Sequence, residues 1–366
     1  MVGAGLAGAA AARLLAEAGR KVLVVDKRRQ VGGNCFDYKN ANNITVHRYG
    51  PHIFHTDDSN VWQFVRRFAQ FHYYQHRVLS YVDGMHVPFP INTDTVAALF
   101  GRELDCAGLA DFLAGEVKVS RFDVPARNFR DAVVAQVGER LYELFFRNYT
   151  EKQWQQLPEN LSPELAQRIP IRSNRDSRYF ADRFQGIPRQ GYTRLVENML
   201  QHDNIALLLG VDYLPLKTRF DADLVVYTGQ LDAFFDYHYG PLGYRSVALE
   251  FVDMDCEYYQ TAPVINYPND YEWTRVTEFK YFLNEESRRS TVLFEYPSAA
   301  GEPFYVTLSE ENSAKRQQYL HEVRTLEESG KYVFVGRLAE YKYYNMDQVI
   351  AAAMTKVQEW SKRYGA

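Results

Sequence analysis

The chain has 366 residues, a formal net charge of −4 and three cysteines. This length suffices for one large domain or about two to three smaller ones with substantial cores. The small negative charge predicts no bulk attraction to nucleic acid or to anionic membranes. The sequence contains no run of about 18 uninterrupted apolar residues, so it predicts no membrane-spanning helix. Because Cys35, Cys106 and Cys256 are widely spaced and odd in number, we expect a reducing, cytoplasmic location, with neither a disulfide framework nor a metal site.

The chain opens on a glycine-rich motif of the dinucleotide-binding kind. Residues 3–8 read G-x-G-x-x-G, and a helix over 9–18, a strand over 21–25 and then Asp26 are predicted to follow. In such a βαβ unit the glycines let the backbone approach a pyrophosphate, the helix N-terminus favours its charge, and the acid binds ribose hydroxyls. A glycine-rich turn without a ligand is the alternative. Because only two residues precede Gly3, we expect the first strand to lack upstream residues in this sequence.

The residues after Asp26 distinguish between cofactors. Gly32 and Gly33 form a second glycine pair, as in FAD-binding domains of the glutathione-reductase type, and permit another close backbone approach. An NADP-binding domain more often replaces the acid with room for a 2′-phosphate. The sequence therefore favours FAD. No second G-x-G-x-x-G follows, so we expect no dedicated NAD(P)H-binding domain in this chain. The external reductant is then predicted to act transiently at the same cleft or from a separate protein.

The remaining pattern is that of an α/β domain with two insertions. Alternation predicts a β-hairpin over 73–90, and apolar residues at three- and four-residue spacing predict helices over 93–168. The later predicted elements are a helix and a strand within 196–209, strands over 222–229, 246–252, 274–282, 290–296 and 332–337, and an amphipathic helix over 346–360.

The predicted fold class is α/β: an FAD-binding Rossmann-like domain with an inserted helical bundle and an inserted antiparallel β-sheet domain. We assign residues 1–70, 185–232 and 325–366 to the discontinuous FAD-binding domain. Residues 92–180 form the helical domain that carries the substrate lid. Residues 71–91 and 233–324 form the antiparallel β domain.

Histidines and tyrosines supply candidate site residues. His52, His55 and His76 are clustered in the sequence, but no further ligand residues stand near them, so no metal site is predicted. Imidazoles beside a flavin and ordinary buried histidines are equal alternatives. The 27 tyrosines and 23 phenylalanines suit either a wet pocket that stacks rings or a tyrosine-rich core with an oligomer interface.

Nine sequence strings, taken in order, are the most specific signal in the chain. The strings are YGPHIFHT from Tyr49, YQHRV from Tyr74, YTEKQW from Tyr149, RIPIR from Arg168, NRDSRYF from Asn174, GIPRQGYT from Gly186, NYPNDY from Asn266, EYP from Glu295 and GRLAEYKYYNMDQVI from Gly336. Together they closely resemble bacterial UDP-galactopyranose mutases. The resemblance runs from Gly3 to the last helix and therefore covers essentially the whole chain.

This resemblance implies an FAD-dependent isomerase that interconverts UDP-galactopyranose and UDP-galactofuranose for cell-surface glycans. In that family the N5 atom of reduced FAD attacks the anomeric carbon and displaces UDP. An iminium then forms, and the sugar ring opens and recloses in contracted form. The resemblance also implies a homodimer, an external reductant and a mobile lid over 168–178.

The resemblance assigns roles to individual residues. Arg168, Arg275 and His55 are implied to be catalytic, with the two arginines binding the pyrophosphate through charge-assisted hydrogen bonds. The residues implied to bind substrate are His76, Tyr149, Trp154, Tyr179, Arg245, Tyr305, Tyr343 and Asn345. The residues implied to bind FAD are Gly3, Gly5, Leu6, Ala7, Gly8, Asp26, Lys27, Gly33, Asn34, His52, Ile53, Thr228, Gly336, Arg337, Tyr344, Met346 and Asp347.

The chain departs from the family pattern at a few positions. Gln155 stands where glycine is expected, EPFYV over 302–306 replaces the usual PYYP, and Asn345 stands where many members have aspartate. Two other classes of function stay open. The first is an amine-oxidase-like flavin oxidoreductase, which would have little need of paired arginines. The second is a non-catalytic Rossmann protein, which would hold a partner and no flavin.

Overall fold

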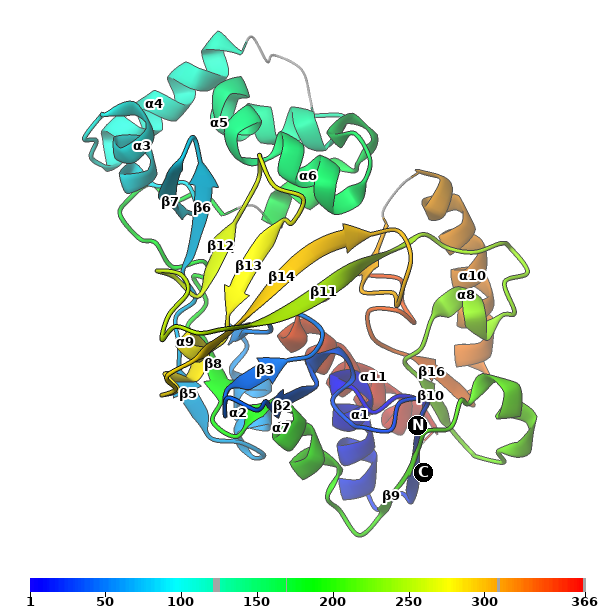
Figure 1. Ribbon diagram of the computed structural model, residues 1–366. Helices are drawn as coiled ribbons and strands as arrows, with labels where there is room; N and C mark the ends of the chain where they lie inside the picture. The colour runs from blue at the N-terminus through cyan, green and yellow to red at the C-terminus, as the bar shows by residue number, and fades with distance from the viewer. Residues whose placement is uncertain (121–125, 169, 308–309, 365–366) are drawn as a thin grey trace.

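The computed structural model describes residues 1–120, 126–168, 170–307 and 310–364, with the side chains of residues 167, 168, 310 and 311 left aside (Figure 1). Its helices are α1 (Leu6–Glu17), α2 (Ser59–Arg66), α3 (Thr93–Phe100), α4 (Cys106–Val119), α5 (Phe129–Phe145), α6 (Arg147–Trp154), α7 (Gly191–Leu200), α8 (Leu231–Phe234), α9 (Lys280–Leu283), α10 (Glu310–Glu328) and α11 (Met346–Tyr364). Its strands are β1 (Val22–Asp26), β2 (Asp37–Lys39), β3 (Thr45–His47), β4 (Phe54–Thr56), β5 (Phe71–Tyr73), β6 (Val78–Val82), β7 (Met85–Phe89), β8 (Phe184–Pro188), β9 (Ile205–Leu209), β10 (Val225–Tyr227), β11 (Tyr244–Met254), β12 (Val264–Asn266), β13 (Arg275–Glu278), β14 (Ser290–Ser298), β15 (Tyr305–Val306) and β16 (Tyr332–Phe334).

A parallel layer built from distant parts of the chain forms one end of the molecule (Figure 1). Strand β1 pairs with β9, and β10 pairs with β16, both in parallel. Val2 joins the two pairs, because it forms parallel bridges to Val25 on one side and to Tyr227 on the other. The early glycine motif therefore lies at the middle of this layer, where the fold class predicted from the sequence requires it.

Helix α1 packs closely in this layer because its buried residues are small. Ala9, Ala10, Ala11 and Ala12 are fully buried, and α1 lies against α11 and α7. Alanine has the highest intrinsic helix propensity and leaves room for a neighbouring helix to approach. The helix stops before Gly19, whose φ of 83° is one that glycine adopts without strain.

The middle of the molecule is a seven-stranded sheet in the order β15-β11-β14-β13-β12-β6-β7. All of its neighbouring strands are antiparallel except β12 and β6. The hairpin predicted over 73–90 is confirmed as β6 and β7. The strand predicted over 274–282 is wrong beyond Glu278, because α9 begins at Lys280. Phe279 and Phe282 are both buried at the three-residue spacing of a helical turn, and this spacing prevails over the alternation.

Two small antiparallel units connect the parallel layer to the large sheet, and neither is predicted from the sequence. Strands β2 and β3 form a pair, and β4, β8 and β5 form a three-stranded sheet in that order. Most of these strands have three residues, which is too short for alternation to be visible in a sequence. They matter for the site because β4 and the segment before β8 border it.

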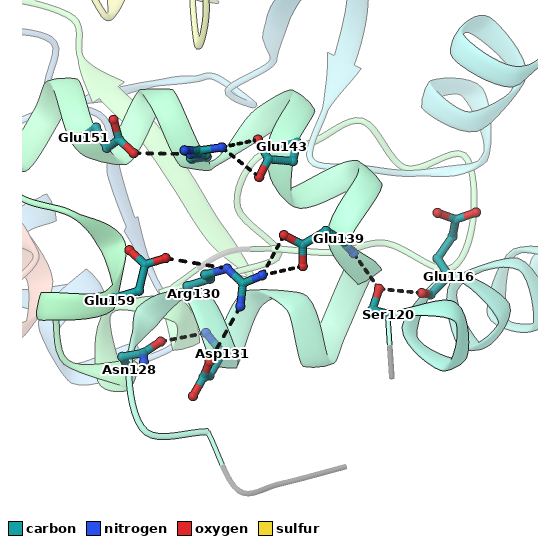
Figure 2. Close-up of polar contacts among 10 residues, drawn as sticks. Glu116, Ser120, Asn128, Arg130, Asp131, Glu139, Glu143, Glu151 and Glu159 are labelled. Carbon is teal, nitrogen blue, oxygen red and sulfur yellow. Dashed lines mark hydrogen bonds and ion pairs between the residues drawn. The ribbon is translucent and has the colours of Figure 1, made fainter. Parts of the chain in front are cut away.

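Helices α3 to α6 form the opposite end of the molecule, as predicted for 93–168 (Figure 1). Helix α5 bends at Gly138, whose φ is 80° and whose hypothetical Cβ would lie 2.6 Å from Glu116. Figure 2 shows the contacts that span this bend. The Glu139 amide donates to Ser120 Oγ at 2.8 Å, and Arg130 donates to both carboxylate oxygens of Glu139 at 2.7 and 2.8 Å. The bend thus brings α4 and α5 into direct backbone contact.

Replacing Gly138 with alanine is expected to lower the free energy of unfolding by about 2–4 kcal/mol, since the new methyl group clashes with α4 and the positive φ is strained. Gly115 in α4 is the matched control, because a Cβ there meets nothing within 4 Å. Alanine at position 115 should raise stability by up to about 1 kcal/mol. Denaturant unfolding of both variants checks this, and equal stability of the two would contradict the close α4–α5 contact.

Among the described residues, no helix is long and apolar enough to cross a membrane. Within the same part of the chain, no group of three or more His, Cys, Asp or Glu side chains is arranged to hold a metal ion.

Candidate functional site

The two glycine motifs of the sequence meet in space at the end of β1. A Cβ at Gly33 would lie 2.9 Å from the Gly5 Cα, so the two turns are in backbone contact. Gly3 has a φ of 102°, and a Cβ there would lie 2.0 Å from Thr228 Oγ1. Such positions accept only glycine. The result is a surface made of bare backbone at the N-terminus of α1, which suits a pyrophosphate.

Asp26 is held at the carboxyl end of β1. Its carboxylate accepts hydrogen bonds from the amides of Ala4 at 2.7 Å and Arg28 at 2.8 Å. Asp26 also lines the cavity described next, where its carboxylate can accept further hydrogen bonds. This is the position at which an acid binds ribose hydroxyls in dinucleotide-binding folds.

A cavity of about 490 Å³ extends from these turns. Most of the residues predicted to bind a cofactor line it. They are Gly3, Gly5, Leu6, Ala7, Asp26, Lys27, Gly33, Asn34, His52, Thr228, Gly336, Arg337, Tyr344 and Met346. The backbone cradle, the acid and the position at the carboxyl ends of parallel strands all fit a dinucleotide.

Three residues of the same predicted set do not line this cavity. A Cβ at Gly8 would lie 1.9 Å from the Gly3 carbonyl oxygen, so Gly8 acts through the close approach of α1 to the strand layer. Ile53 lines the second cavity instead. Asp347 in the first turn of α11 lines neither cavity, and its Oδ1 is buried without a partner among the described residues.

A second cavity of about 440 Å³ lies beneath the large sheet and contains most of the predicted catalytic and substrate residues. These are His55, His76, Tyr149, Tyr179, Arg275, Tyr305, Tyr343 and Asn345. The two cavities share five wall residues, which are Asn34, His52, Arg337, Asn345 and Met346. They are therefore contiguous, and a ligand in one lies next to a ligand in the other.

Arg275 is the central cation of the second cavity. It lies on β13 directly opposite Glu295 of β14, and its Nε is 2.7 Å from Glu295 Oε1. Glu295 is almost fully buried, and burial raises the pKa of its carboxyl group while the Arg275 charge opposes that rise. The pair meets the distance of a salt bridge but not the angles of a hydrogen bond. Glu295 thus lies at the Nε edge of the guanidinium. Among the described residues no hydrogen bond from the terminal nitrogens is found, so these nitrogens can bind a ligand anion.

Aromatic rings surround this cation. Tyr305 and Tyr343 are stacked with centroids 5.7 Å apart, and the Arg337 guanidinium lies 5.0 Å from the Tyr343 ring. Burial raises the pKa of Tyr305 to about 12, so its hydroxyl stays protonated and can donate a hydrogen bond. Tyr149 on α6 and Tyr179 contribute further rings to the same cavity. The arrangement suits a ligand that has both a planar ring and phosphate oxygens.

Several histidines near the site are held neutral. Burial lowers the pKa of His47, His52 and His76 to about 3, and for His76 the charge of Arg275 acts in the same direction. His52 Nδ1 lies 2.8 Å from the Gly50 carbonyl oxygen, and the His52 amide donates to His47 Nδ1. Neutral rings can bind ligands through hydrogen bonds and add no positive charge to the cavities.

These histidines predict a sensitivity to acid. Between about pH 6.5 and pH 3 the unfolded chain binds protons at the three imidazoles and the folded chain does not. Each therefore reduces the free energy of unfolding by about 1.4 kcal/mol per pH unit as the pH falls through this window. Denaturant unfolding at pH 7 and pH 5 measures the slope. Equal stability at both pH values would contradict the burial of these rings.

Three of the predicted residues are not placed in the second cavity. The side chain of Arg168 lies outside the described residues. Trp154 at the end of α6 lines neither cavity and packs against the core. Arg245 at the start of β11 is buried opposite Tyr305, lines neither cavity, and leaves Nε and Nη2 without a partner among the described residues.

Sequence reasoning missed several wall residues. Arg28 and Glu302 form a salt bridge at the edge of the first cavity, and Arg28 also lies over the Tyr49 ring. Phe180 and Asp182 line the second cavity. Arg28, Glu302 and Phe180 stand within or beside motifs named in the sequence analysis, and Asp182 does not. None of the four residues is of a type that indicates a bound ligand by itself.

Comparison with known proteins agrees with this geometry. The family model "GLF: UDP-galactopyranose mutase" matches residues 144–343, and a model of NAD(P)-binding Rossmann-like domains matches residues 1–68. A Klebsiella pneumoniae protein named "Probable UDP-galactopyranose mutase" is 39% identical over 98% of this chain and 94% of its own length. The chain belongs to the UDP-galactopyranose mutase family.

A further relative and two solved structures are also similar to this chain. The dTDP-fucopyranose mutase of Escherichia coli is 36% identical over 99% of this chain and 98% of its own length. Among solved structures, reduced UDP-galactopyranose mutase has a TM-score of 0.78 at 17% identity, covering 100% of this chain and 94% of that one. Wild-type putrescine oxidase bound to putrescine has a TM-score of 0.57 at 13% identity, covering 98% and 97%. At such identities these likenesses show the fold alone.

Two predictions from the sequence are confirmed by these results. The resemblance to UDP-galactopyranose mutases is confirmed by the family model and the relatives. The α/β fold with a Rossmann-like dinucleotide-binding region is confirmed by the second model and by the solved structure of a family member. The roles of individual residues and the domain boundaries stay predictions.

Proposed function

We propose that this protein interconverts UDP-galactopyranose and UDP-galactofuranose with FAD in the first cavity and the nucleotide sugar in the second. The observation that carries the proposal is the shared wall of the two cavities. A dinucleotide bound along the glycine turns would end next to Arg275, which is the place for a pyrophosphate leaving group. Family membership supports the same reaction.

FAD, when bound and reduced, supplies the nucleophile for the anomeric carbon in this reaction. The residues of the first cavity fit it: Gly5 and Gly33 leave room for the pyrophosphate, and Asp26 is placed for ribose hydroxyls. The N-terminus of α11, where Met346 lines both cavities, adds a positive electrostatic end near the shared wall.

The residues of the second cavity perform binding and charge stabilisation. Arg275 stabilises the negative charge that develops on the pyrophosphate as the bond to the sugar breaks. We expect Tyr305, Tyr343 and Tyr179, which line this cavity, to donate hydrogen bonds to phosphate oxygens. We expect Tyr149 to stack on the base. We also propose Arg168 as the second pyrophosphate arginine, as the motif order indicates.

A direct substrate comparison tests this assignment. The purified protein is loaded with FAD, reduced, and incubated separately with UDP-galactofuranose and with the furanose form of dTDP-fucose, since a relative named for the latter sugar is 36% identical. We expect faster conversion of the UDP sugar. Faster conversion of the dTDP sugar would reassign the substrate within the family, and oxygen consumption with an amine but no isomerisation would favour the oxidoreductase.

The assembly and the source of electrons are also proposals. We propose a homodimer in the cytoplasm that receives electrons from an external reductant. Sedimentation equilibrium of the FAD-loaded protein is expected to give twice the chain mass, and a single chain mass would contradict the dimer.

A further inference from the structure

His55 has an environment unlike that of the other histidines near the cavities. It lies on β4, and its Nδ1 is 3.1 Å from Asp182 Oδ2. The Phe180 ring is stacked on the imidazole, with centroids 3.7 Å apart and an interplanar angle of 12°. The ring is therefore fixed from one face by an aromatic side chain and from its edge by a carboxylate.

The segment that carries both partners is itself held in place. Gln185 on β8 is buried and lies directly opposite His55 in the sheet. Its side-chain amide donates to the carbonyl oxygens of Phe180 at 3.2 Å and Asp182 at 2.8 Å. The relative position of the imidazole and the carboxylate is thus set by one strand pair and one amide.

The two ring nitrogens of His55 differ in access. Nδ1 is fully buried, and its contact with Asp182 meets the distance of an ion pair but not the angles of a hydrogen bond. The described residues offer Nδ1 no other acceptor, so a small rotation of either side chain would complete this hydrogen bond. Nε2 is not among the buried, unpartnered atoms, and His55 lines the second cavity. By contrast, His52 Nδ1 lies against a backbone carbonyl oxygen, and His76 Nδ1 lies 3.1 Å from the Tyr74 hydroxyl. Of these three cavity histidines, only His55 faces a carboxylate among the residues that the structure describes.

We propose that Asp182 is a positioning residue that holds His55 in the Nδ1–H tautomer, so that Nε2 is a hydrogen-bond acceptor inside the substrate cavity. The physical basis is general: the partner of one ring nitrogen decides which nitrogen carries the proton, and a carboxylate can only accept. Loss of the carboxylate leaves Nδ1 without an acceptor and removes the preference. The ring then presents Nε2–H to the cavity, which is a donor in place of an acceptor.

The group that donates to Nε2 belongs to whatever occupies the second cavity. For the proposed function it is a donor of the O–H or N–H class, either a sugar hydroxyl or the N–H of the reduced flavin. The tautomer itself does not depend on that function, and this separates failure of the present inference from failure of the proposed one.

The tautomer is measured directly by ¹⁵N NMR of protein labelled at histidine, with His55 assigned by comparison with His55→Gln. In the wild-type chain we expect the His55 signals of an Nδ1–H, Nε2-acceptor ring. An Nε2–H ring in the wild type would overturn the proposal whatever the variants do. In Asp182→Ala we expect the Nδ1–H signature to be lost, and its persistence would equally overturn it.

Four states of the wild-type protein then distinguish the donors. The Nε2 signal is compared in the FAD-free protein, with oxidised FAD, with reduced FAD, and with oxidised FAD plus UDP-galactopyranose. A shift on reduction alone identifies the flavin N–H, and a shift on sugar binding alone identifies a hydroxyl. No shift in any state would show that Nε2 accepts nothing and would contradict the acceptor role.

Activity supplies a second readout. Asp182→Ala is expected to lower kcat by about tenfold or more with little change in KM, because ligand charge and stacking contacts are untouched. Asp182→Glu should recover part of kcat. The control is Asp255→Asn, a surface aspartate whose side chain is 95% exposed. Equal kcat for Asp182→Ala and the control would contradict the positioning role.

Discussion

Replacing Arg275 with methionine is expected to reduce turnover by about 10²–10³-fold or more and, separately, to destabilise the fold. The turnover loss follows from the proposed role of Arg275, which lines the second cavity, as a donor to the substrate pyrophosphate, since removing one preorganised donor has an effect of this size. Turnover at saturating UDP-galactofuranose, with the flavin reduced, measures the first effect.

The stability effect arises from Glu295, whose carboxylate is left buried without its counter-charge. Breaking a buried ion pair in this way costs about 3–5 kcal/mol. The double variant Arg275→Met/Glu295→Leu removes both charges, and it should recover most of the stability while remaining inactive. Denaturant midpoints of the two variants test this separation. Near wild-type turnover in either variant would contradict the role of Arg275, whereas equal instability of both would contradict the coupling to Glu295.

Alanine at Gly33 is expected to lower the affinity for FAD by about 100-fold or more. Its methyl group would lie 2.9 Å from the Gly5 Cα, where the two glycine turns meet and where we propose that the backbone approaches the FAD pyrophosphate. Titration of FAD into the FAD-free protein, followed by flavin fluorescence, measures the affinity. The fraction of FAD retained on purification gives an independent check.

Gly19 provides a matched control for this change. It has a φ of 83°, so alanine there carries a comparable left-handed backbone strain, but a Cβ at Gly19 meets nothing within 4 Å. The Gly19→Ala variant should bind FAD as the wild type does. If both variants bound FAD equally, the contact between the two glycine turns would not form the pyrophosphate site.

The parallel layer could be predicted from the sequence because its signals are local. The glycine spacing, the alanine-rich helix and the acid at the end of β1 stand within the first 26 residues, and each has a direct physical reason. Strand β10 and helix α11 have equally clear apolar patterns. The inserted β hairpin was predictable for the same reason, since β6 and β7 alternate on either side of a tight Asp83-Gly84 turn.

Other parts of the fold depend on contacts that no local pattern contains. Strands β4 and β8 pair across about 130 residues and are too short to alternate visibly, yet their register places Gln185 opposite His55. The helix α9 replaced the end of a predicted strand because Phe279 and Phe282 pack into the core together. Helix α10 was not predicted, since its residues are mostly polar.

The candidate site was likewise predictable where sequence motifs carry it and not where it depends on contacts between distant segments. Motif order, through the family resemblance, placed Arg275 and the tyrosines, and the structure brings them to one cavity. The motif order could not indicate that Glu295 pairs with Arg275, because that contact arises from the register of β13 and β14. Asp182 was missed since a single aspartate in a loop has no distinguishing spacing, and its relation to His55 exists only in the folded chain.

The central claim is that FAD in the first cavity acts on a nucleotide sugar in the second. The most direct test is chromatography of UDP-galactofuranose incubated with the FAD-loaded protein, with and without dithionite. Conversion to UDP-galactopyranose with reduced flavin, and none with oxidised flavin, is the predicted result. No conversion by protein that carries reduced flavin, or equal conversion in both redox states, would contradict the account.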